Sequence, residues 1–368
     1  MKLTAIQESI ARAGLDGWLL YDFQGTNRIS SRVAGIPSPL SRRWFCLVPA
    51  KGDPTWVVHR IEQGPFEHAP GRKIVYLSYR ELGEALQRIL GGVRRVAMEY
   101  SPRAMLPTTS RVDGGTIELV RGTGVEVVGS AELAQQFFAP WGSEGLASHR
   151  RAAAALDRAK EVALARVRES FATGRALTET EVQAGIVKDL TDAGLYFDHP
   201  PIVAVGSHAG NPHFEPSTEH DATIGRDSVL MIDLWAKERT EQAVYADMTW
   251  MAYTGTAMPE AVAGAWRAVR EARDAVVEDL RCRFARGEQV TGGSLDRVAR
   301  SVIEAAGHGA AFIHRTGHSI GRELHGDGAN LDDLETRDDR VLLVDTGFSV
   351  EPGIYLPEWG GVRIEDDV

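Results

Sequence analysis

Short apolar runs separated by polar, glycine and proline residues fill the first part of the chain. Residues 3–13 come first, and their apolar positions recur at helical spacing, which predicts an amphipathic helix. The runs that follow read GWLLY, WFCLVP, TWVVH, KIVYL and RVAMEY, and ELGEALQRIL between the last two has a helical pattern. Short apolar runs bounded by turn-forming residues are typical of strands. This alternation predicts a three-layer α/β domain over residues 1–146.

The pattern changes at FAPWGSEGLASH, residues 138–149, where a segment with proline and glycine leads into a long stretch rich in Ala, Arg and Glu. We therefore predict a second domain over residues 147–368. PIVAVG, SVLMIDLW and VLLVDTGFSV are its predicted strands, and they do not alternate strictly with helices. The fold class predicted for the chain is therefore α+β rather than a doubly wound sheet.

Four helices are expected in this second domain. The first runs to about residue 171, and the second is opened by Thr178 with Glu181 three residues later, which is the capping-box pattern. The last two are predicted over 259–284 and 294–306.

Composition narrows the kinds of partner. The 368 residues carry a net charge of -10, which argues against a nucleic-acid-binding protein. The two cysteines, Cys46 and Cys282, form no pair pattern, as expected in a reducing compartment, and they exclude a thiolate metal site. No apolar run approaches the roughly 18 residues of a membrane span, and the N-terminus has no signal core. We expect a cytoplasmic protein with no nucleic-acid or membrane partner.

The stretch GHSIG, residues 317–321, fits the nucleophile-elbow pattern G-x-S-x-G of serine hydrolases, with Ser319 as the nucleophile. In that fold an apolar strand leads into the serine, and an acid and a histidine follow on later loops. Here FIHRTGH precedes the serine, and the one later histidine, His325, follows after six residues with Glu323 the only acid between. This spacing disfavours a serine hydrolase and leaves the imidazoles as the candidate chemistry.

Four acidic residues stand in apolar, strand-like surroundings. They are Asp233 in SVLMIDLWAK, Asp247 in VYADMTWMAY, Glu351 in GFSVEPGIYL and Glu365 in GGVRIEDDV. Singly, each is best explained as an edge-strand acid facing water. Together they would repel one another if buried, unless they are protonated, paired or metal-bound.

Two divalent cations would balance four carboxylates and leave one neutral imidazole to spare. An oxygen-rich set with one nitrogen suits Mn, Co or Zn, although ligand type alone does not choose among them. Two such ions can hold and ionise a water between them, which is hydrolytic machinery.

The succession of Asp233, Asp247, His318 in GHSIG, Glu351 in EPGIY and Glu365 in GVRIED resembles the pita-bread metallopeptidases. This is peptidase family M24, with methionine aminopeptidase, aminopeptidase P and prolidase. The resemblance covers roughly residues 147–368. The first part of the chain is similar to the smaller domain of aminopeptidase P, prolidase and creatinase. The resemblance implies a C-terminal pita-bread catalytic domain preceded by this smaller domain, and an Xaa-Pro aminopeptidase or Xaa-Pro dipeptidase.

By this resemblance Asp233 would bind one metal ion, Asp247 and Glu365 would bridge two ions, and His318 would complete the second. Glu351 would be both a ligand and the catalytic proton acceptor, and a metal-bridging hydroxide would attack the carbonyl before proline.

The resemblance also implies residues that contact substrate. His213 in NPHFEPS and His325 would act in catalysis and in substrate binding, and His314, Tyr355 and Arg363 would bind substrate. Alternatives remain open for each: a histidine beside a proline can simply end a turn, and an aromatic at a strand end is more often core.

The sequence departs from the family pattern at three places. Asp247 lies 14 residues after Asp233, farther than the usual hairpin spacing, so we expect KERTEQ to form an extended loop that moves the turn and spares the ligands. Gly326 stands where many relatives have Glu. The chain ends three residues after Glu365, which leaves open how that residue is anchored and whether the C-terminus is complete.

Two other functions stay open at this point. One is a creatinase-like metal-independent amidinohydrolase, and the other is an inactive pita-bread binding protein. The intact set of five ligands disfavours both. The expected partner is a proline-containing peptide, and the resemblance implies a homodimer. The sequence leaves open whether the substrate is a dipeptide or a longer peptide.

Overall fold

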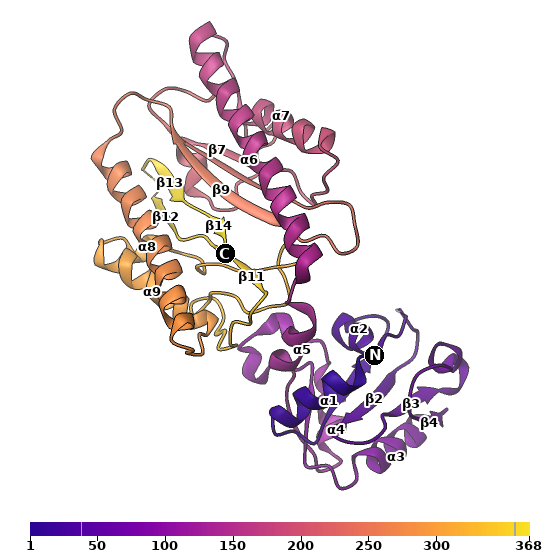
Figure 1. The fold of residues 1–368 in the computed structure, drawn as a ribbon. Coiled ribbons are helices and arrows are strands. Elements are labelled where there is room, and N and C mark those ends of the chain that lie inside the picture. The colour runs from indigo at the N-terminus through magenta and orange to yellow at the C-terminus, as the bar shows by residue number, and fades with distance from the viewer. Residues whose placement is uncertain (38, 357) are drawn as a thin grey trace. The chain divides into compact units, whose positions relative to one another are not determined.

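The computed structural model describes residues 1–37, 39–356 and 358–368. The chain forms two compact units, a first unit of Met1–Phe137 and a second unit of Phe138–Val368 (Figure 1). This division falls ahead of residue 147, because the whole of helix α6, Gly142–Thr173, belongs to the second unit. Each unit is described by itself.

A six-stranded mixed sheet forms the centre of the first unit, in the order β4-β3-β2-β1-β5-β6. Its strands are β1 (Gly17–Asp22), β2 (Trp44–Pro49), β3 (Thr55–His59), β4 (Arg72–Tyr76), β5 (Arg95–Met98) and β6 (Glu126–Gly129). The helices are α1 (Leu3–Arg12), α2 (Arg28–Ala34), α3 (Tyr79–Leu90), α4 (Gly114–Arg121) and α5 (Ala131–Phe138). The predicted amphipathic helix and the five predicted strands are therefore confirmed.

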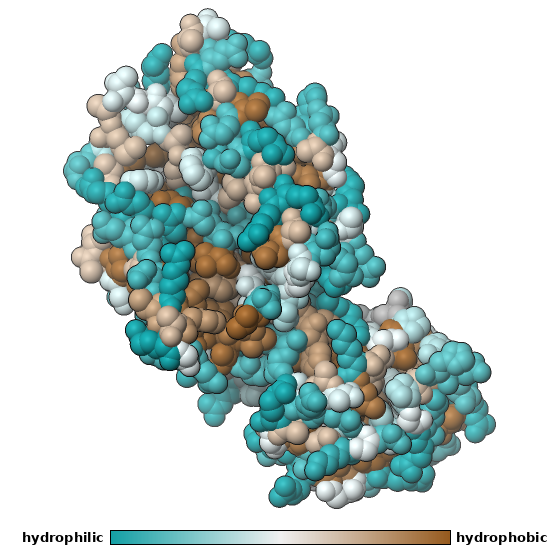
Figure 2. All heavy atoms as spheres, in the orientation of Figure 1, coloured by the Kyte–Doolittle hydropathy of each residue, from teal (hydrophilic) through white to brown (hydrophobic). Residues whose placement is uncertain are grey.

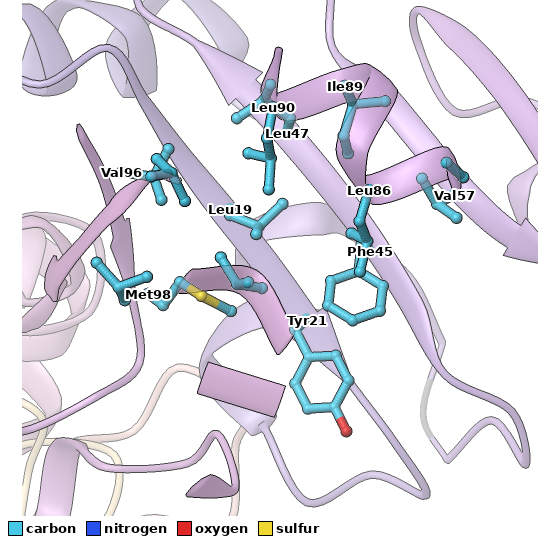
Figure 3. Packing of buried hydrophobic residues seen from close by; sticks show 14 of the residues in the cluster. Leu19, Tyr21, Phe45, Leu47, Val57, Leu86, Ile89, Leu90, Val96 and Met98 are labelled. Atoms are coloured by element: carbon cyan, nitrogen blue, oxygen red, sulfur yellow. The ribbon is translucent and has the colours of Figure 1, made fainter. Parts of the chain in front are cut away.

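Both faces of this sheet are covered. Leu19 and Tyr21 of β1 pack in one cluster with Leu86 of α3 (Figure 3). Trp18 and Leu20, the alternate residues of the same strand, are also fully buried, and they point to the opposite face because side chains alternate along a strand. Strands that are apolar on both faces are typical of a sheet between two layers.

A buried carboxylate joins separate segments of the first unit. Glu99, just after β5, accepts hydrogen bonds from Trp18 Nε1 (2.7 Å), Asn27 Nδ2 (2.7 Å), Ser30 Oγ (2.5 Å) and Ser130 Oγ (2.9 Å). Its side chain has no exposure to water. Four donors thus stabilise one carboxylate that would otherwise be costly to bury.

The strands of the second unit form small antiparallel sheets. β7 (Ile202–Val205), β8 (Val229–Ala236) and β9 (Ala246–Tyr253) form the first sheet; β10 (Ser319–Ile320), β11 (Gly347–Val350) and β14 (Asp366–Asp367) form the second; β12 (Gly353–Leu356) and β13 (Gly360–Arg363) form a hairpin. The helices are α6, α7 (Glu179–Asp192), α8 (Glu260–Ala285) and α9 (Gly292–Ala305), with short 3-10 turns at η5 (Gly206–Gly210) and η6 (Gly309–Ala311).

The helices cover the strands in two clusters. Leu156 of α6 and Ile186 of α7 pack against Ile232 of β8. Helices α8 and α9 pack in a second cluster with the strands near the C-terminus (Figure 1). All four predicted helices are present, and the capping box at Thr178 is formed, so the predicted α+β class is confirmed.

The β8–β9 hairpin places two acidic residues side by side. Asp233 lies opposite Thr249, and Asp247 lies opposite Trp235, so the two aspartates are diagonal neighbours on one face of the hairpin. Strand pairing ends at Ala236 and Ala246, and the connection between them absorbs the extra length. The expectation of an extended loop that spares the pairing is confirmed.

The predicted strand VLLVDTGFSV is wrong over its first part. Only Gly347–Val350 is a strand. Asp345 has a positive φ of 62°, which breaks an extended backbone, and the Val344 side chain is 71% exposed. Apolar composition alone did not reveal this turn.

Glycines allow β13 to lie against η5. A Cβ on Gly361 would lie 2.2 Å from the carbonyl oxygen of Ala209, and Gly360 has a φ of +120° that side-chain-bearing residues rarely adopt. This close approach brings Arg363, at the end of β13, beside the turn after η5, where its guanidinium donates to the carbonyl oxygen of Pro212 at 3.4 Å.

In the described parts of the chain, no helix combines the length and the apolar character needed to cross a membrane. Figure 2 shows hydrophilic residues over much of the visible face of each unit, with hydrophobic residues gathered on part of the second unit. Even α6, with 32 residues, carries charged residues along its length.

We expect Glu99→Ala to destabilise the first unit by about 2–4 kcal/mol, because it leaves several buried donors unpaired. Urea denaturation followed by circular dichroism measures this loss. Glu118→Gln, an exposed position on α4 of the same unit, is the matched control and should change stability by less than about 0.5 kcal/mol. Equal stabilities for the two variants would contradict the role given to Glu99.

Candidate functional site

A cavity of about 410 Å³ opens in the second unit beside the strands that carry the acidic residues. Nine of the ten site residues predicted from the sequence line it: His213, Asp233, Asp247, His314, His318, His325, Glu351, Arg363 and Glu365. Tyr355, the tenth, is buried, and its hydroxyl lies 2.8 Å from Nε2 of His314. The rest of the wall is Ile202, Pro212, Trp235, Ile313, Arg315, Leu324 and Glu335.

Separate backbone segments deliver the ligand candidates. Asp233 and Asp247 come from the hairpin face described above, and His318 immediately precedes β10. Glu351 follows β11, and its N–H donates to the carbonyl oxygen of Thr316 at 2.7 Å. The strands thus bring together residues more than a hundred positions apart in the sequence.

Glu365 is anchored to Thr249 by both its backbone and its side chain. Its N–H donates to the carbonyl oxygen of Thr249 at 3.3 Å, and its carboxylate accepts from the Thr249 hydroxyl at 2.8 Å. The next two residues, Asp366 and Asp367, form β14 and pair with β11.

Distances among the donors suit a metal centre. Nε2 of His318 lies 3.6 Å from Oδ2 of Asp247 and 3.6 Å from Oε1 of Glu351. One possible ligand atom from each of Asp247, His318 and Glu365 lies within 4.8 Å of the other two. Two atoms that bind one cation at about 2.0–2.2 Å lie at most about 4.4 Å apart, and the two separations of 3.6 Å meet this limit.

Burial and mutual repulsion raise the pKa of most of these carboxyl groups. The pKa of Asp233 is raised to about 7, first by burial, against the lowering effect of Arg363. Burial also raises the pKa of Asp247 and, together with the Asp247 charge, holds that of Glu365 well above its usual range. Arg363 donates to Oδ2 of Asp233. Its single positive charge offsets only part of the negative charge of these acids.

Two buried oxygens of the ligand candidates have no hydrogen-bond partner in the described part of the chain. Among the described residues, Oδ1 of Asp233 and Oδ1 of Asp247 are buried and accept no hydrogen bond. Buried acceptors are normally satisfied, and a divalent cation would satisfy both oxygens and offset the repulsion. The donor set of four carboxylates and one imidazole therefore fits hard or borderline divalent metals.

Glu351 differs from the other acids. Burial would raise its pKa, but neighbouring positive charges, that of His318 first among them, outweigh burial and lower it. The Ser349 hydroxyl donates to Oε1 of Glu351 at 3.0 Å. Glu351 is thus an ionised, oriented carboxylate in the cavity wall.

The histidines around the cavity differ in charge. Burial would lower the pKa of His318, but the neighbouring Asp247 and Glu351 carboxylates raise it. Burial lowers the pKa of His314, and burial together with the His318 charge lowers that of His325 to about 4. His325 packs edge to face on His318, with ring centres 4.3 Å apart. His314 and His325 are therefore neutral at pH 7.

Ser319 is buried away from the cavity. It is 1% exposed and does not line the cavity, and its hydroxyl accepts from the N–H of Gly328 at 3.0 Å. The residue of the elbow-like pattern therefore holds a neighbouring loop, and the serine hydrolase interpretation is excluded by its burial.

Sequence reasoning missed several residues of this site. Thr249 donates to Glu365 and accepts from Arg363 at 2.9 Å; its position two residues after Asp247, on the same strand face, was the available signal. Asp367 accepts from the N–H of Asp247 at 2.8 Å, and burial holds its pKa well above its usual range. Arg315 brings a guanidinium to the cavity wall.

Comparison with known sequences agrees with this geometry. The sequence model of metallopeptidase family M24 matches residues 147–368. An Xaa-Pro dipeptidase from Lactobacillus delbrueckii subsp. lactis is 30% identical over 223 residues, which are 59% of this chain and 53% of the relative. The chain thus spans about half the length of the curated relatives of this kind that it matches.

Two solved structures resemble the whole chain. Dipeptidase PepE from Mycobacterium ulcerans gives a TM-score of 0.67 at 24% identity, covering 100% of this chain and 91% of that one. Prolidase from Pyrococcus horikoshii OT3 gives a TM-score of 0.60 at 23% identity, covering 100% and 94%. At these identities the likeness concerns the fold, and it confirms the predicted pita-bread arrangement with a smaller N-terminal unit.

In the metal-free protein, we expect the free energy of unfolding to fall as the pH rises from about 6.5 to about 8. Asp233, Asp247 and Glu365 have raised pKa values in the folded chain, so they hold more protons there than in the unfolded chain. His314 and His325, whose pKa values are lowered, oppose this effect only below about pH 6.5. Stability then decreases with pH, by on the order of a few kcal/mol. Urea denaturation in a chelator at several pH values measures the slope.

Asp233→Asn should flatten this slope, and added Mn²⁺ should remove it by offsetting the charge. Glu241→Gln in the exposed hairpin loop is the matched control and should leave the slope unchanged. A metal-free chain that gains stability over the same pH range would show that the carboxylates are not repelling one another.

Proposed function

Because the chain belongs to metallopeptidase family M24, we propose that it is a dinuclear-metal-dependent Xaa-Pro peptidase. It hydrolyses the peptide bond before proline. The observation that carries this proposal is the convergence of five ligand residues and three histidines on one cavity. We further propose, from the resemblance alone, that it works as a homodimer in the cytoplasm.

Five side chains would hold the two ions. They are Asp233, Asp247, His318, Glu351 and Glu365, and Glu351 would also be the proton acceptor of the reaction. When bound, two divalent ions such as Mn, Co or Zn supply a water of lowered pKa and an electrophile for the carbonyl oxygen. The orphaned oxygens of Asp233 and Asp247 support this assignment.

Glu351 is the proton carrier of the reaction. Its lowered pKa keeps it ionised, so it accepts the proton of the attacking water, and Ser349 holds the accepting carboxylate in place. The same proton then passes to the nitrogen of proline as the peptide bond breaks. Acid and base steps by one positioned carboxyl group require this orientation.

The cavity wall suits a proline ring. Proline has no N–H to recognise, so a site for it depends on shape and apolar contact, which Ile202, Trp235 and Ile313 offer. His213 and His325 would contact the peptide around the bond that is cleaved. His314, whose Nε2 lies 2.8 Å from the Tyr355 hydroxyl, would present a fixed neutral ring to the substrate.

Arg315 favours a dipeptide over a longer peptide. Its guanidinium lines the cavity and makes no hydrogen bond or ion pair within the described residues, while its N–H donates to Glu335 at 2.9 Å. A dipeptide ending in proline carries a free carboxylate next to the cleaved bond, and arginine pairs well with carboxylates. A cavity of about 410 Å³ is also near the small end for ligand sites.

We expect protein reconstituted with Mn²⁺, Co²⁺ or Zn²⁺ to hydrolyse Ala-Pro, and the metal-free protein to do so at least about 10³-fold more slowly. Chromatographic detection of free proline measures the rate. A reconstituted protein that leaves every Xaa-Pro dipeptide and Xaa-Pro-Yaa tripeptide intact would overturn the proposed function.

Arg315→Ala should raise the KM for Ala-Pro at least about 10-fold, because it removes one charge-assisted contact. The KM for Ala-Pro-amide, which has no carboxylate, should change less than 2-fold, and Arg315→Lys should be intermediate. Arg286→Ala, an exposed arginine at the end of α8, is the control. Equal effects on both substrates would remove Arg315 from carboxylate recognition.

A further inference from the structure

A second buried carboxylate lies outside the metal cavity. Glu179, the first residue of α7, has no exposure to water. Its Oε1 accepts from the N–H of Val205 at 2.7 Å, and its Oε2 accepts from the N–H of Ala222 at 2.9 Å. Nδ1 of His208 lies 3.0 and 2.9 Å from the two oxygens. One carboxylate therefore ties α7 to the end of β7, to η5 and to the loop before β8.

His208 links this carboxylate to an aromatic ring. A carboxylate that already accepts two backbone N–H groups is best matched by the His208 tautomer with hydrogen on Nδ1. The other side of the imidazole stacks on Phe214, with ring centres 4.2 Å apart and planes at 26°. Phe214 is 8% exposed, so the pair of rings fixes the backbone at that position.

The residue beside Phe214 is His213, which reaches the metal cavity. Its side chain is exposed and makes no hydrogen bond within the described residues. Only the backbone holds it: its N–H donates to Oδ1 of Asn211 at 3.1 Å, and Arg363 donates to the carbonyl oxygen of Pro212 at 3.4 Å. An exposed side chain on a turn keeps one position only if both flanks of the turn are anchored.

We propose that Glu179 and His208 are positioning residues that hold His213 in the substrate cavity through the stacked ring of Phe214. Arg363 anchors the turn on the other side. Neither Glu179 nor His208 lines the cavity, so both act through another residue. The proposal rests on the proposed function in one respect, that His213 contacts the substrate.

A displacement of about 1 Å in a group that contacts the reacting bond can cost up to about 10²-fold in rate. We therefore expect His208→Ala to lower kcat/KM for Ala-Pro about 10-fold, mainly through kcat. His208→Asn keeps an N–H donor for Glu179 but removes the ring that stacks on Phe214. Phe214→Leu keeps a buried apolar side chain but removes the ring that stacks on His208. Both should lose activity by less than His208→Ala. His220→Ala, an exposed histidine of the neighbouring loop, should lose none.

A double-mutant cycle tests whether His208 acts through His213. In the His213→Ala background, His208→Ala should lower kcat/KM less than 2-fold, because residues that act as one unit are not additive. Losses of the same size in both backgrounds, or no loss in the wild-type background, would overturn the proposal. If His208→Ala does not fold by circular dichroism, His208→Asn and Phe214→Leu take its place in the cycle.

A second measurement does not depend on activity. In histidine-labelled, metal-free protein, the ring signal of His213, assigned with His213→Ala, should shift or broaden in His208→Ala and stay fixed in His220→Ala. An unchanged His213 signal would refute the positioning role. If no Xaa-Pro substrate is hydrolysed by the wild type, the proposed function fails, and the His213 signal still decides the positioning claim.

Discussion

Repulsion among carboxylates held out of water is the constraint on which the second unit depends. Four acids face one cavity, and Arg363 and His318 are buried basic groups beside them. Side chains free to turn toward water would relieve the repulsion, so the backbone must fix them from separate directions. The β8–β9 hairpin, the strands around His318 and the bridge from Thr249 to Glu365 supply those directions.

Other charged groups hold the loops around this cluster. Asp296 of α9 is fully buried and accepts from Arg300 at 2.7 Å and from the Thr316 hydroxyl at 2.6 Å, and Arg300 also donates to the carbonyl oxygen of His314. Asp338 pairs with Arg340 at 2.7 Å, and Arg340 donates to the carbonyl oxygen of Gly328, three residues after His325, at 2.6 Å. Because each acid meets a cation or several N–H groups, these networks stabilise loops that would otherwise be free to move.

The sequence predicted the parts of the structure that leave a local signal. Asp233 and Asp247 could be found because they are acids inside apolar runs. The helices could be found from helical periodicity and a capping box. The turn at Asp345 was missed because the turn-forming residues Asp345 and Gly347 stand inside an apolar run. Arg315, Asp367 and Glu179 could not be found either, since their roles come from neighbours that only the folded chain brings close. Charged residues are common on surfaces, so their identity alone says little.

The β8–β9 hairpin separates the length of its turn from the position of its aspartates. Side-chain positions follow from strand register, which ends at Ala236 and Ala246, whereas residues 239–241 are exposed beyond it. Exposed loop tips tolerate inserted segments. The tip is thus a suitable place for an epitope or a fluorescent label in engineered versions. Insertions or deletions at this tip would also leave the positions of Asp233 and Asp247 unchanged.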